Sequence, residues 1–363
     1  MARVSAILVN YHTATDIHHA VRSVLDQGLP CEIIVVDNSA DDTEGQALRA
    51  GLPEGVRLIV NPVNTGFACA CNQAYAQSTG EAVLLLNPDA ALLPGALATL
   101  CKALGTDPKL GAVGPKVYWD SAQTFALPPS TFPSVADYCE VGLSRHSRLL
   151  RGWRTRRFRA WSWRYWQRAR PVPVAALSGG HVLLRRSAVE AAGGLFDERF
   201  FMYWEDSDLM QRLRHAGYRL HMIPAARALH AYTHTPEKGR MIGVGWPQYF
   251  EKHLQRSLWV RLVQRLQQFP APPVSTHWSL ADLDPQTGDL RLPVPAAWRD
   301  GWLLELSPNP DFIPAMGRWG QGDTVCVAAS LHGRFRGEFY ARLGPQKAWP
   351  WQMQCWRFFN GAS

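Results

Sequence analysis

The first residues that could do chemistry stand where a buried apolar run stops. Leu84, Leu85 and Leu86 are followed at once by Asn87-Pro88-Asp89. In an open α/β sheet, ligands bind outside the carboxyl ends of the strands, so Asp89 would lie beside a ligand's phosphates and their counter-ion. Asn-Pro-Asp is also a common turn sequence, and these residues alone leave that structural alternative open.

Polar residues end two further apolar runs. Asn10-Tyr11 follows the first run, and Asp37-Asn38 follows the second. An acid in the position of Asp37 commonly holds the hydroxyl or imino groups of a ribose or base, although it could also cap a turn or helix. No Gly-x-Gly-x-x-Gly turn follows the first run, so the main signature of a dinucleotide-binding dehydrogenase is missing.

A loop between a predicted strand and a predicted helix contains Asn64 and Gly66. The exposed amides of the helix and the glycine would allow close approach by a phosphate or sugar. Asn64 could equally cap the helix.

Carboxylates gather in Trp204-Glu205-Asp206-Ser207-Asp208, at a predicted helix start. Acids in a first turn stabilise a helix by roughly 0.3 to 1 kcal/mol each, which is a sufficient structural explanation. The preceding apolar residues could instead desolvate one carboxylate and raise its pKa into the range of a general base. Asp208 and Arg212 are four apart and are expected to pair, which leaves Glu205 and Asp206 for chemistry.

His230 follows a predicted strand and a short loop. A single histidine is more often structural than a ligand. With one carboxylate and two phosphate oxygens, however, its imidazole would complete a reasonable shell for Mn²⁺ or Mg²⁺.

The pattern of apolar residues predicts a doubly wound α/β fold in the first part of the chain. Helical and extended patterns alternate, as right-handed crossover connections require. The predicted strands are Val4 to Val9, Glu32 to Val36, Val56 to Val60, Ala82 to Leu86, Val174 to Arg185 (interrupted by Gly179-Gly180) and Tyr218 to Ile223, and the predicted helices include Phe67 to Gln77, Pro94 to Leu104 and Glu205 to Ala216.

Two domains are expected. A proline-rich linker, Phe269 to Pro273, would separate residues 1–268, which carry a basic aromatic insertion at about 120–172, from residues 274–363. The second unit contains short alternating segments at Trp302 to Leu306, Thr324 to Ala328 and Glu338 to Arg342, which predict a small antiparallel β module. Its tryptophans are most simply explained as core.

Composition restricts the class of protein. The seven cysteines contain no Cys-x-x-Cys pair, so neither a disulfide framework nor a zinc site is indicated, and reduced thiols in a cytosol are expected. We see no signal peptide and no apolar run of membrane-spanning length. The net charge of +8 implies anionic partners.

Taken in order, these motifs resemble the family 2 inverting glycosyltransferases of GT-A fold, and within them the bacterial rhamnosyltransferase-like branch. The resemblance covers roughly residues 3 to 235. It rests on the following segments: Ala6 to Tyr11, Val35 to Ser39, Asn61 to Ala68, Leu86 to Ala90, Gly193 to Phe201 and Trp204 to Leu209.

The resemblance implies a role for each motif. Asp37 would bind the nucleotide base, Asp89 and His230 would hold a divalent cation (Mg²⁺ or Mn²⁺), and Asp206, beside Glu205, would be the catalytic base. Asn87 replaces the first aspartate of the family's Asp-x-Asp motif, which leaves one firm carboxylate ligand. The implied donor-binding residues are Asn10, Tyr11, Asp37, Asn38, Asn64, Gly66, Asn87 and Asp89, and the implied acceptor-binding residues are Gly179, Gly180 and Trp204.

The implied reaction transfers a sugar, with rhamnose as the leading candidate, from a nucleoside diphosphate. The acceptor would be a glycan or a polyprenyl-diphosphate-linked sugar in cell-surface polysaccharide synthesis. Asp206 would deprotonate the acceptor hydroxyl, and configuration would invert in one displacement. The alternative is a catalytically inactive nucleotide- or glycan-binding relative.

One segment suggests where such a protein would act. Arg145 to Arg170 holds ten arginines and four tryptophans and no acidic residue. Arginines bind phosphates and tryptophans settle among lipid headgroups, so we expect peripheral contact with an anionic membrane, at the inner face of the cytoplasmic membrane. Binding of single-stranded nucleic acid is the weaker alternative and is not expected, and a solvated basic helix is the structural one. An oligomer is left open.

Overall fold

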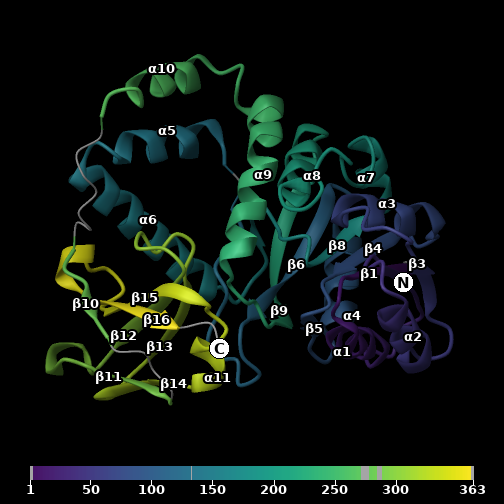
Figure 1. The fold of residues 1–363 in the computed structure, drawn as a ribbon, viewed down its shortest axis with the longest axis horizontal. Helices are drawn as coiled ribbons and strands as arrows, with labels where there is room; N and C mark the ends of the chain where they lie inside the picture. Colours follow the sequence, from purple (N-terminus) through teal and green to yellow (C-terminus); the bar gives the residue numbers. More distant parts are fainter. Residues whose placement is uncertain (1–2, 132, 271–277, 284–287, 361–363) are drawn as a thin grey trace.

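The computed structural model describes residues 3–131, 133–270, 278–283 and 288–360 (Figure 1). Strands and helices alternate along the first part of the chain, as the apolar pattern predicts. In order they are β1 (Val4–Asn10), α1 (Ala14–Leu25), β2 (Cys31–Asp37), α2 (Asp42–Gly51), β3 (Arg57–Val60), α3 (Phe67–Gln77), β4 (Ala82–Leu86), β5 (Ala90–Leu92), α4 (Ala96–Thr106) and β6 (Leu110–Tyr118).

The middle of the chain is mainly helical. Its elements are α5 (Val135–Ser144), α6 (Arg148–Trp166), β7 (Val172–Pro173), β8 (His181–Arg185), α7 (Arg186–Ala191), α8 (Glu205–His215), β9 (Arg219–His230), α9 (Pro236–His253) and α10 (Leu258–Leu266). The last part contains β10 (Ala281–Asp282), β11 (Leu290–Pro293), η1 (Ala296–Trp298), β12 (Trp302–Ser307), β13 (Met316–Gly320), β14 (Thr324–Val327), α11 (Ala329–His332), β15 (Gly337–Gly344), η2 (Pro350–Gln352) and β16 (Gln354–Asn360).

A large sheet forms the body of the molecule, in the order β3-β2-β1-β4-β8-β6-β9-β5, with β7 beside β9. Strands β1, β2, β3, β4, β6 and β9 run in one direction, and β5, β7 and β8 run the opposite way. The buried faces of α1, α2 and α4 pack on one side, whereas α3, α7 and α8 pack on the other. The predicted doubly wound, mostly parallel α/β fold is confirmed.

Strand β9 corrects the sequence prediction. The expected strand ended at Ile223, before Pro224, but β9 continues to His230 and pairs with β6 on both sides of a register shift after Pro115. A bulge of this kind tolerates a proline that a regular ladder would exclude. His230 therefore ends a strand and does not follow a loop. The expected strand from Val174 is also shorter, because β8 begins only at His181.

The C-terminal strands form a second sheet, in the order β10-β16-β15-β12-β13, and β11 pairs with β14 separately. The predicted antiparallel module is present, with one parallel pair between β10 and β16. Its core includes Trp119 and Phe125 from the insertion. Figure 1 shows α6 running alongside this sheet. The predicted linker lies outside the described residues from position 271 onward, so the domain boundary remains a prediction.

Helix α6 joins the two parts through buried charge. Arg159 of α6 and Arg342 of β15 both pair with Glu305 of β12, and all three side chains are 0% exposed. Arg159 and the buried Trp166 lie inside the arginine-rich segment for which membrane contact was expected. These two side chains cannot reach a bilayer, so any contact must involve the exposed remainder. No helix among the described residues is long and apolar enough to cross a membrane.

We expect Glu305→Gln to destabilise the protein by about 3 to 5 kcal/mol, because the substitution leaves two buried guanidinium groups without a counter-charge. Urea unfolding followed by tryptophan fluorescence would measure the change. Asp282→Asn is the matched control, since it removes an exposed carboxylate that pairs with Arg357, and it should leave the stability nearly unchanged. Equal effects of the two substitutions would contradict this account.

Candidate active site

The carboxyl ends of β1 and β2 meet in register, with Asn10 opposite Asp37. The Asn10 amide nitrogen donates to Asp37 Oδ1 at 3.0 Å and to Ser39 Oγ at 3.2 Å. Asp37 is fully buried, and its Oδ2 has no hydrogen-bond partner among the described residues. Tyr11, by contrast, is about half exposed. The structure thus leaves a buried acceptor atom beside a solvent-facing aromatic ring.

Asn38 organises the loop before α3. Its amide nitrogen donates to Asn64 Oδ1 at 2.8 Å and to the Gly66 carbonyl at 3.3 Å. Asn64 does not cap the helix in the usual way; Gly66 occupies the N-cap position without a side-chain bond. Gly66 has φ of 85°, and a Cβ there would lie 2.6 Å from the Phe201 carbonyl oxygen. Only glycine fits this position, and the absence of a side chain lets the loop pack against the segment that leads to α8.

Asp89 and His230 lie together at the edge of the sheet. Ala90 of β5 pairs with His230 of β9, and Asp89 Oδ1 is 3.1 Å from His230 Nε2. Burial alone would raise the pKa of Asp89, but the adjacent imidazole lowers it below its usual value. A carboxylate oxygen and an imidazole nitrogen suit a divalent transition-metal ion or Mg²⁺. Among the described residues, no group of three or more metal-binding side chains is present.

Gly179 and Gly180 connect this edge to α8. The Asn87 N–H donates to the Gly180 carbonyl at 2.9 Å, and the Gly179 N–H donates to Asp206 Oδ2 at 3.1 Å. A Cβ on Gly180 would lie 2.7 Å from the side-chain nitrogen Nδ2 of Asn87. The pair of glycines therefore brings Asp206 into the same site as the Asn87-Pro88-Asp89 turn. Trp204 lies at the start of α8, two residues before Asp206.

Two consecutive residues before α8 adopt left-handed backbone conformations, Tyr203 with φ of 69° and Trp204 with φ of 74°. Such conformations are strained for aromatic residues and persist only where the surroundings enforce them. The Trp204 indole nitrogen donates to the Ile242 carbonyl at 2.8 Å, which fixes the ring. Sequence reasoning missed this feature, because neither residue is glycine, asparagine or aspartate.

The carboxylates of α8 have three different environments. Burial, followed by the neighbouring Asp206, raises the pKa of Glu205 well above its usual value, and Glu205 Oε2 has no partner among the described residues. Burial also raises the pKa of Asp206, although its oxygens accept from the Gly179 and Ser207 amides. Both carboxylates therefore have a raised pKa, which is a property that general-base chemistry requires, and Glu205 is the more buried of the two.

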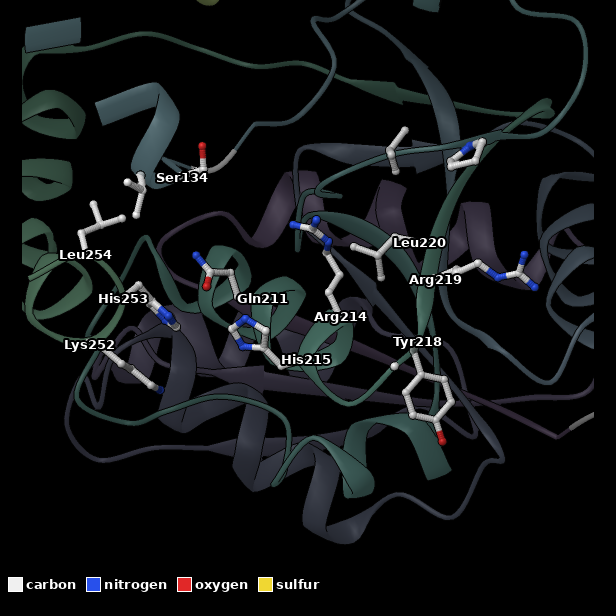
Figure 2. A pocket seen from close by; sticks show the side chains of 14 residues that line it. Ser134, Gln211, Arg214, His215, Tyr218, Arg219, Leu220, Lys252, His253 and Leu254 are labelled. Carbon is white, nitrogen blue, oxygen red and sulfur yellow. The ribbon is translucent and has the colours of Figure 1, made fainter. Parts of the chain in front are cut away.

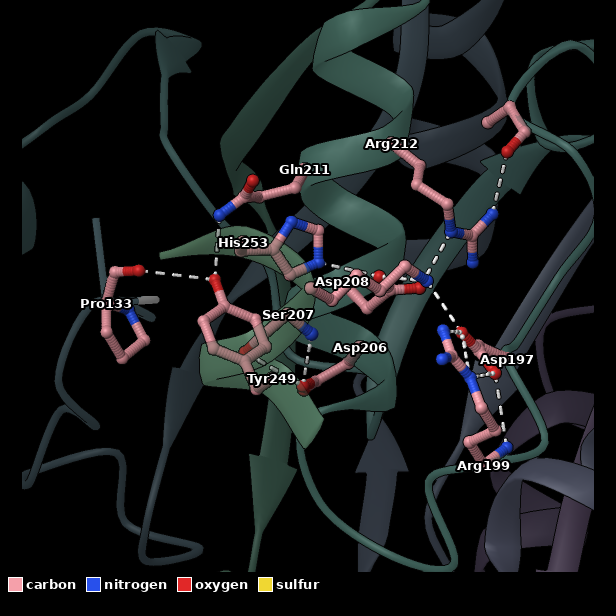
Figure 3. A network of polar contacts seen from close by, with 12 residues as sticks. Pro133, Asp197, Arg199, Asp206, Ser207, Asp208, Gln211, Arg212, Tyr249 and His253 are labelled. Carbon is pink, nitrogen blue, oxygen red and sulfur yellow. Dashed lines mark hydrogen bonds and ion pairs between the residues drawn. The ribbon is translucent and has the colours of Figure 1, made fainter. Parts of the chain in front are cut away.

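Asp208 belongs to a network of polar contacts between α8 and α9 (Figure 3). Arg212 pairs with it at 2.7 Å, as the spacing of four predicted, and Lys252 and His253 of α9 approach at 2.6 and 2.8 Å. Burial opposes ionisation, but hydrogen bonds from His253, Lys252 and Arg212 lower the pKa of Asp208 to about 2. This carboxylate anchors α9 to α8 and is unavailable for catalysis.

His181 is a residue that sequence reasoning did not single out. It lies directly after the two glycines, on β8 opposite Leu86, and its ring centre is 5.5 Å from that of His230. Burial, then the charge of His230, lowers the pKa of His181 to about 3. A neutral imidazole packed against His230 fixes the orientation of that ring. Its position immediately after Gly179-Gly180 was the sequence feature that could have identified it as a candidate site residue.

One large cavity lies elsewhere. It measures about 750 Å³ and is lined by residues at the C-terminal end of α8, including Gln211, Arg214 and His215, together with Lys252 and His253 (Figure 2). None of the predicted site residues lines it. The cavity beside Asp89 is smaller, about 230 Å³, and Arg334 of the C-terminal module reaches it.

Comparison with known proteins identifies the fold as that of an enzyme family. The model for "Glycosyl transferase family 2" matches residues 5–191. The chain belongs to glycosyltransferase family 2. The family match ends before α8 and His230, so those residues are placed by the structure and not by the match.

Similar sequences include rhamnosyltransferases. An N-acetylglucosaminyl-diphospho-decaprenol L-rhamnosyltransferase of Mycobacterium tuberculosis is 34% identical over 222 residues, which is 57% of this chain and 68% of that protein. Rhamnosyltransferase WbbL of Escherichia coli is 47% identical over 57 residues, 16% of this chain and 21% of that protein. A solved mannosyltransferase from Pyrobaculum calidifontis, in complex with GDP-Man and Mn²⁺, is 22% identical with a TM-score of 0.44, covering 75% of this chain and 66% of that chain.

Two carboxylates on α8 should affect stability in opposite directions. Asp208→Asn should lower the free energy of unfolding by about 2 kcal/mol at pH 7. The folded-state pKa of Asp208 is about 2 and its unfolded value is about 4, so its ionised carboxylate stabilises the fold above about pH 4. The stability difference between variant and unaltered protein should disappear as pH falls toward about 2. Glu205→Gln should stabilise the protein at pH 7 and change little near pH 4, because a raised pKa makes the ionised group a cost that appears only as pH rises.

Urea midpoints at pH 4 and pH 7 would test both expectations. Glu190→Gln, an exposed acid on α7, is the control and should be neutral at both values. A loss of stability in Glu205→Gln at pH 7 would show that its carboxylate is needed in the ionised form.

Proposed function

We propose that this chain is an inverting glycosyltransferase that moves a sugar, with rhamnose the leading candidate, from a nucleoside diphosphate to a polyprenyl-diphosphate-linked acceptor. The observation that carries the proposal is the link through Gly179 and Gly180, which joins the Asp206 carboxylate to the Asn87-Pro88-Asp89 turn. A base and a candidate cation site thereby share one edge of the sheet. The lipid-linked acceptor is suggested by the mycobacterial relative, whose name specifies a decaprenol diphosphate.

The donor would lie along the carboxyl ends of β1, β2 and β4. Asp37 Oδ2, buried and without a partner, would accept a hydrogen bond from the nucleotide base, and the Asn64 to Gly66 loop would lie against the sugar or phosphates. Asp89 and His230 would hold a divalent cation, which would supply positive charge near the diphosphate leaving group. Asn87 donates through its backbone to Gly180, so in this chain it holds the turn in place.

Asp206 would act on the acceptor. Its Oδ2 is fixed by the Gly179 amide, and its raised pKa gives it proton affinity that an ordinary aspartate lacks. Asp206 would take the proton of the acceptor hydroxyl, and that oxygen would attack the anomeric carbon from the face opposite the nucleotide. The bond from the anomeric carbon to the diphosphate oxygen would break as the new bond forms, so configuration would invert and the nucleoside diphosphate would leave. Glu205 is buried, whereas Asp206 is partly exposed, which supports Asp206 as the base.

Asp206→Asn should lower sugar transfer by about 10²- to 10⁴-fold, the usual contribution of a general base, and should leave nucleotide affinity unchanged. The assay would measure nucleoside diphosphate release from UDP-, dTDP- and GDP-sugars with a lipid-linked acceptor, in Mg²⁺ or Mn²⁺ and then in chelator. Asp26→Asn, an exposed acid after α1, is the control.

Full activity in Asp206→Asn would show that the base is a different residue. Nucleotide binding without release from any donor or acceptor would favour the alternative of an inactive binding relative.

We further propose that the enzyme acts as a peripheral protein on an anionic membrane, at the inner face of the cytoplasmic membrane, and that α10 provides the contact. Val260 and Val263 pack inward toward α5, whereas Leu258 is 76% and Trp259 69% exposed. Leu262 and Leu266 continue this outer face, and Arg261 and Arg265 border it. An apolar face flanked by arginines suits the headgroup level of an anionic bilayer.

The double variant Leu258→Ser with Trp259→Ser should reduce sedimentation with phosphatidylglycerol vesicles by at least tenfold, because each apolar side chain contributes about 1.5 to 3 kcal/mol when buried. Phe359→Ser, a position on the C-terminal module that is 59% exposed, is the control. Vesicle binding that is unchanged in the double variant, or absent in the unaltered protein, would contradict the assignment to α10.

A further inference from the structure

A cavity of about 800 Å³ lies between α5, α6 and α9, away from the donor edge. Helix α6 lines one wall with Arg154, Arg157, Phe158, Trp161 and Arg164. These positions recur every three or four residues, so they form one stripe of the helix, about 15 Å long at 1.5 Å per residue. Three arginines and two aromatic side chains share this stripe, with the aromatic pair between Arg157 and Arg164.

The opposite wall is aromatic and continuous. Tyr138 of α5 stacks on Trp246 of α9, with ring centres 6.3 Å apart, and Trp246 contacts Trp204 at 5.1 Å. Trp204 precedes Glu205 and Asp206 directly. This wall therefore ends at Trp204, two residues before the carboxylate proposed as the catalytic base.

The charge of the lining is strongly positive. Arg145 joins the arginines of α6, and the acid in the lining, Asp137, is already engaged in the capping box of α5 with Ser134. Arg157 pairs with Glu140. No hydrogen bond or ion pair joins Arg154 to a described residue; burial lowers its pKa, although the charges of Asp311, Glu140 and Asp137 oppose that shift. A half-buried guanidinium with unused donors, facing a cavity, is suited to bind an oxyanion.

Resting on the proposed function, we propose that this cavity binds the isoprenoid diphosphate of the acceptor, with the diphosphate on the arginines of α6 and the first isoprene units against the aromatic wall. The volume is in the range that holds a small amphiphilic ligand. Gln267, at the end of α10, lines the same cavity and contacts Tyr138 at 3.3 Å. The cavity therefore adjoins the helix proposed to contact the bilayer, where an isoprenoid chain would be embedded.

The test measures binding alone, with farnesyl diphosphate as the probe and the intact chain as the protein. Quenching of tryptophan fluorescence would give the dissociation constants of farnesyl diphosphate, inorganic diphosphate, farnesol and dTDP. We expect farnesyl diphosphate to bind more tightly than inorganic diphosphate or farnesol, and to bind in the presence of saturating dTDP. Displacement by dTDP at equal occupancy would overturn the inference, because both ligands would then occupy the donor site.

Arg154→Gln should weaken farnesyl diphosphate binding about tenfold or more, and should leave dTDP affinity unchanged. Arg164→Gln, an exposed member of the same stripe, should weaken it in the same direction and covers the case in which Arg154→Gln fails to fold. Arg168→Gln, exposed beyond the end of α6 and outside the lining, is the control. Unchanged binding in folded Arg154→Gln and Arg164→Gln would overturn the inference.

Failure of this inference and failure of the proposed function give different results. If Arg154→Gln transfers sugar with an unaltered acceptor KM, the proposed function stands and the proposed binding site is wrong. If farnesyl diphosphate binding depends on Arg154 but the chain transfers no sugar, the proposed binding site stands and the proposed function is wrong.

Discussion

The close contact between Gly179-Gly180 and its neighbours is the constraint on which the site depends. A Cβ at Gly180 would lie 2.7 Å from Asn87 Nδ2, and a Cβ at Gly179 would lie 3.1 Å from Asp206 Cβ. Because both positions lack side chains, the chain that leads into β8 can pass close to the end of β4. The Gly179 amide, just before β8, can still donate to the Asp206 carboxylate. The turn with the candidate cation ligand is consequently held by the backbone bond from Asn87 to Gly180, and the candidate base by the bond from the Gly179 amide to the Asp206 carboxylate.

The fold was predictable from local sequence because its strands are buried on both faces and its helices have apolar stripes. Motifs at the ends of β1, β2 and β4 were predictable for the same reason: the carboxyl ends of parallel strands meet at one edge. The length of β9 was not predictable, since Pro224 reads as a strand end unless a bulge is known. Nor were the left-handed Tyr203 and Trp204, whose conformations are imposed by tertiary contacts such as that between Trp204 and Ile242.

The arginine-rich segment shows where composition alone is ambiguous. Arg159 is buried against Glu305, Arg154 faces a cavity, and Arg168 is exposed, although all three belong to one short stretch. Charge composition treats these side chains alike, while helical periodicity separates them by face. Without the position of the C-terminal sheet, however, the sequence could not identify which face is internal. The same helix therefore serves as a scaffold on one side and as a binding wall on another.

The C-terminal module is attached directly to the segment that follows the candidate cation ligand. His234 exchanges backbone hydrogen bonds with Arg334 and Arg336, and Arg334 also donates to the Trp119 carbonyl. For protein engineering, the module is consequently not an interchangeable appendage. A chimera that imports this sheet from a relative must also import the matching partners around Trp119 and His234, or the end of β9 would lose its alignment together with the imported part.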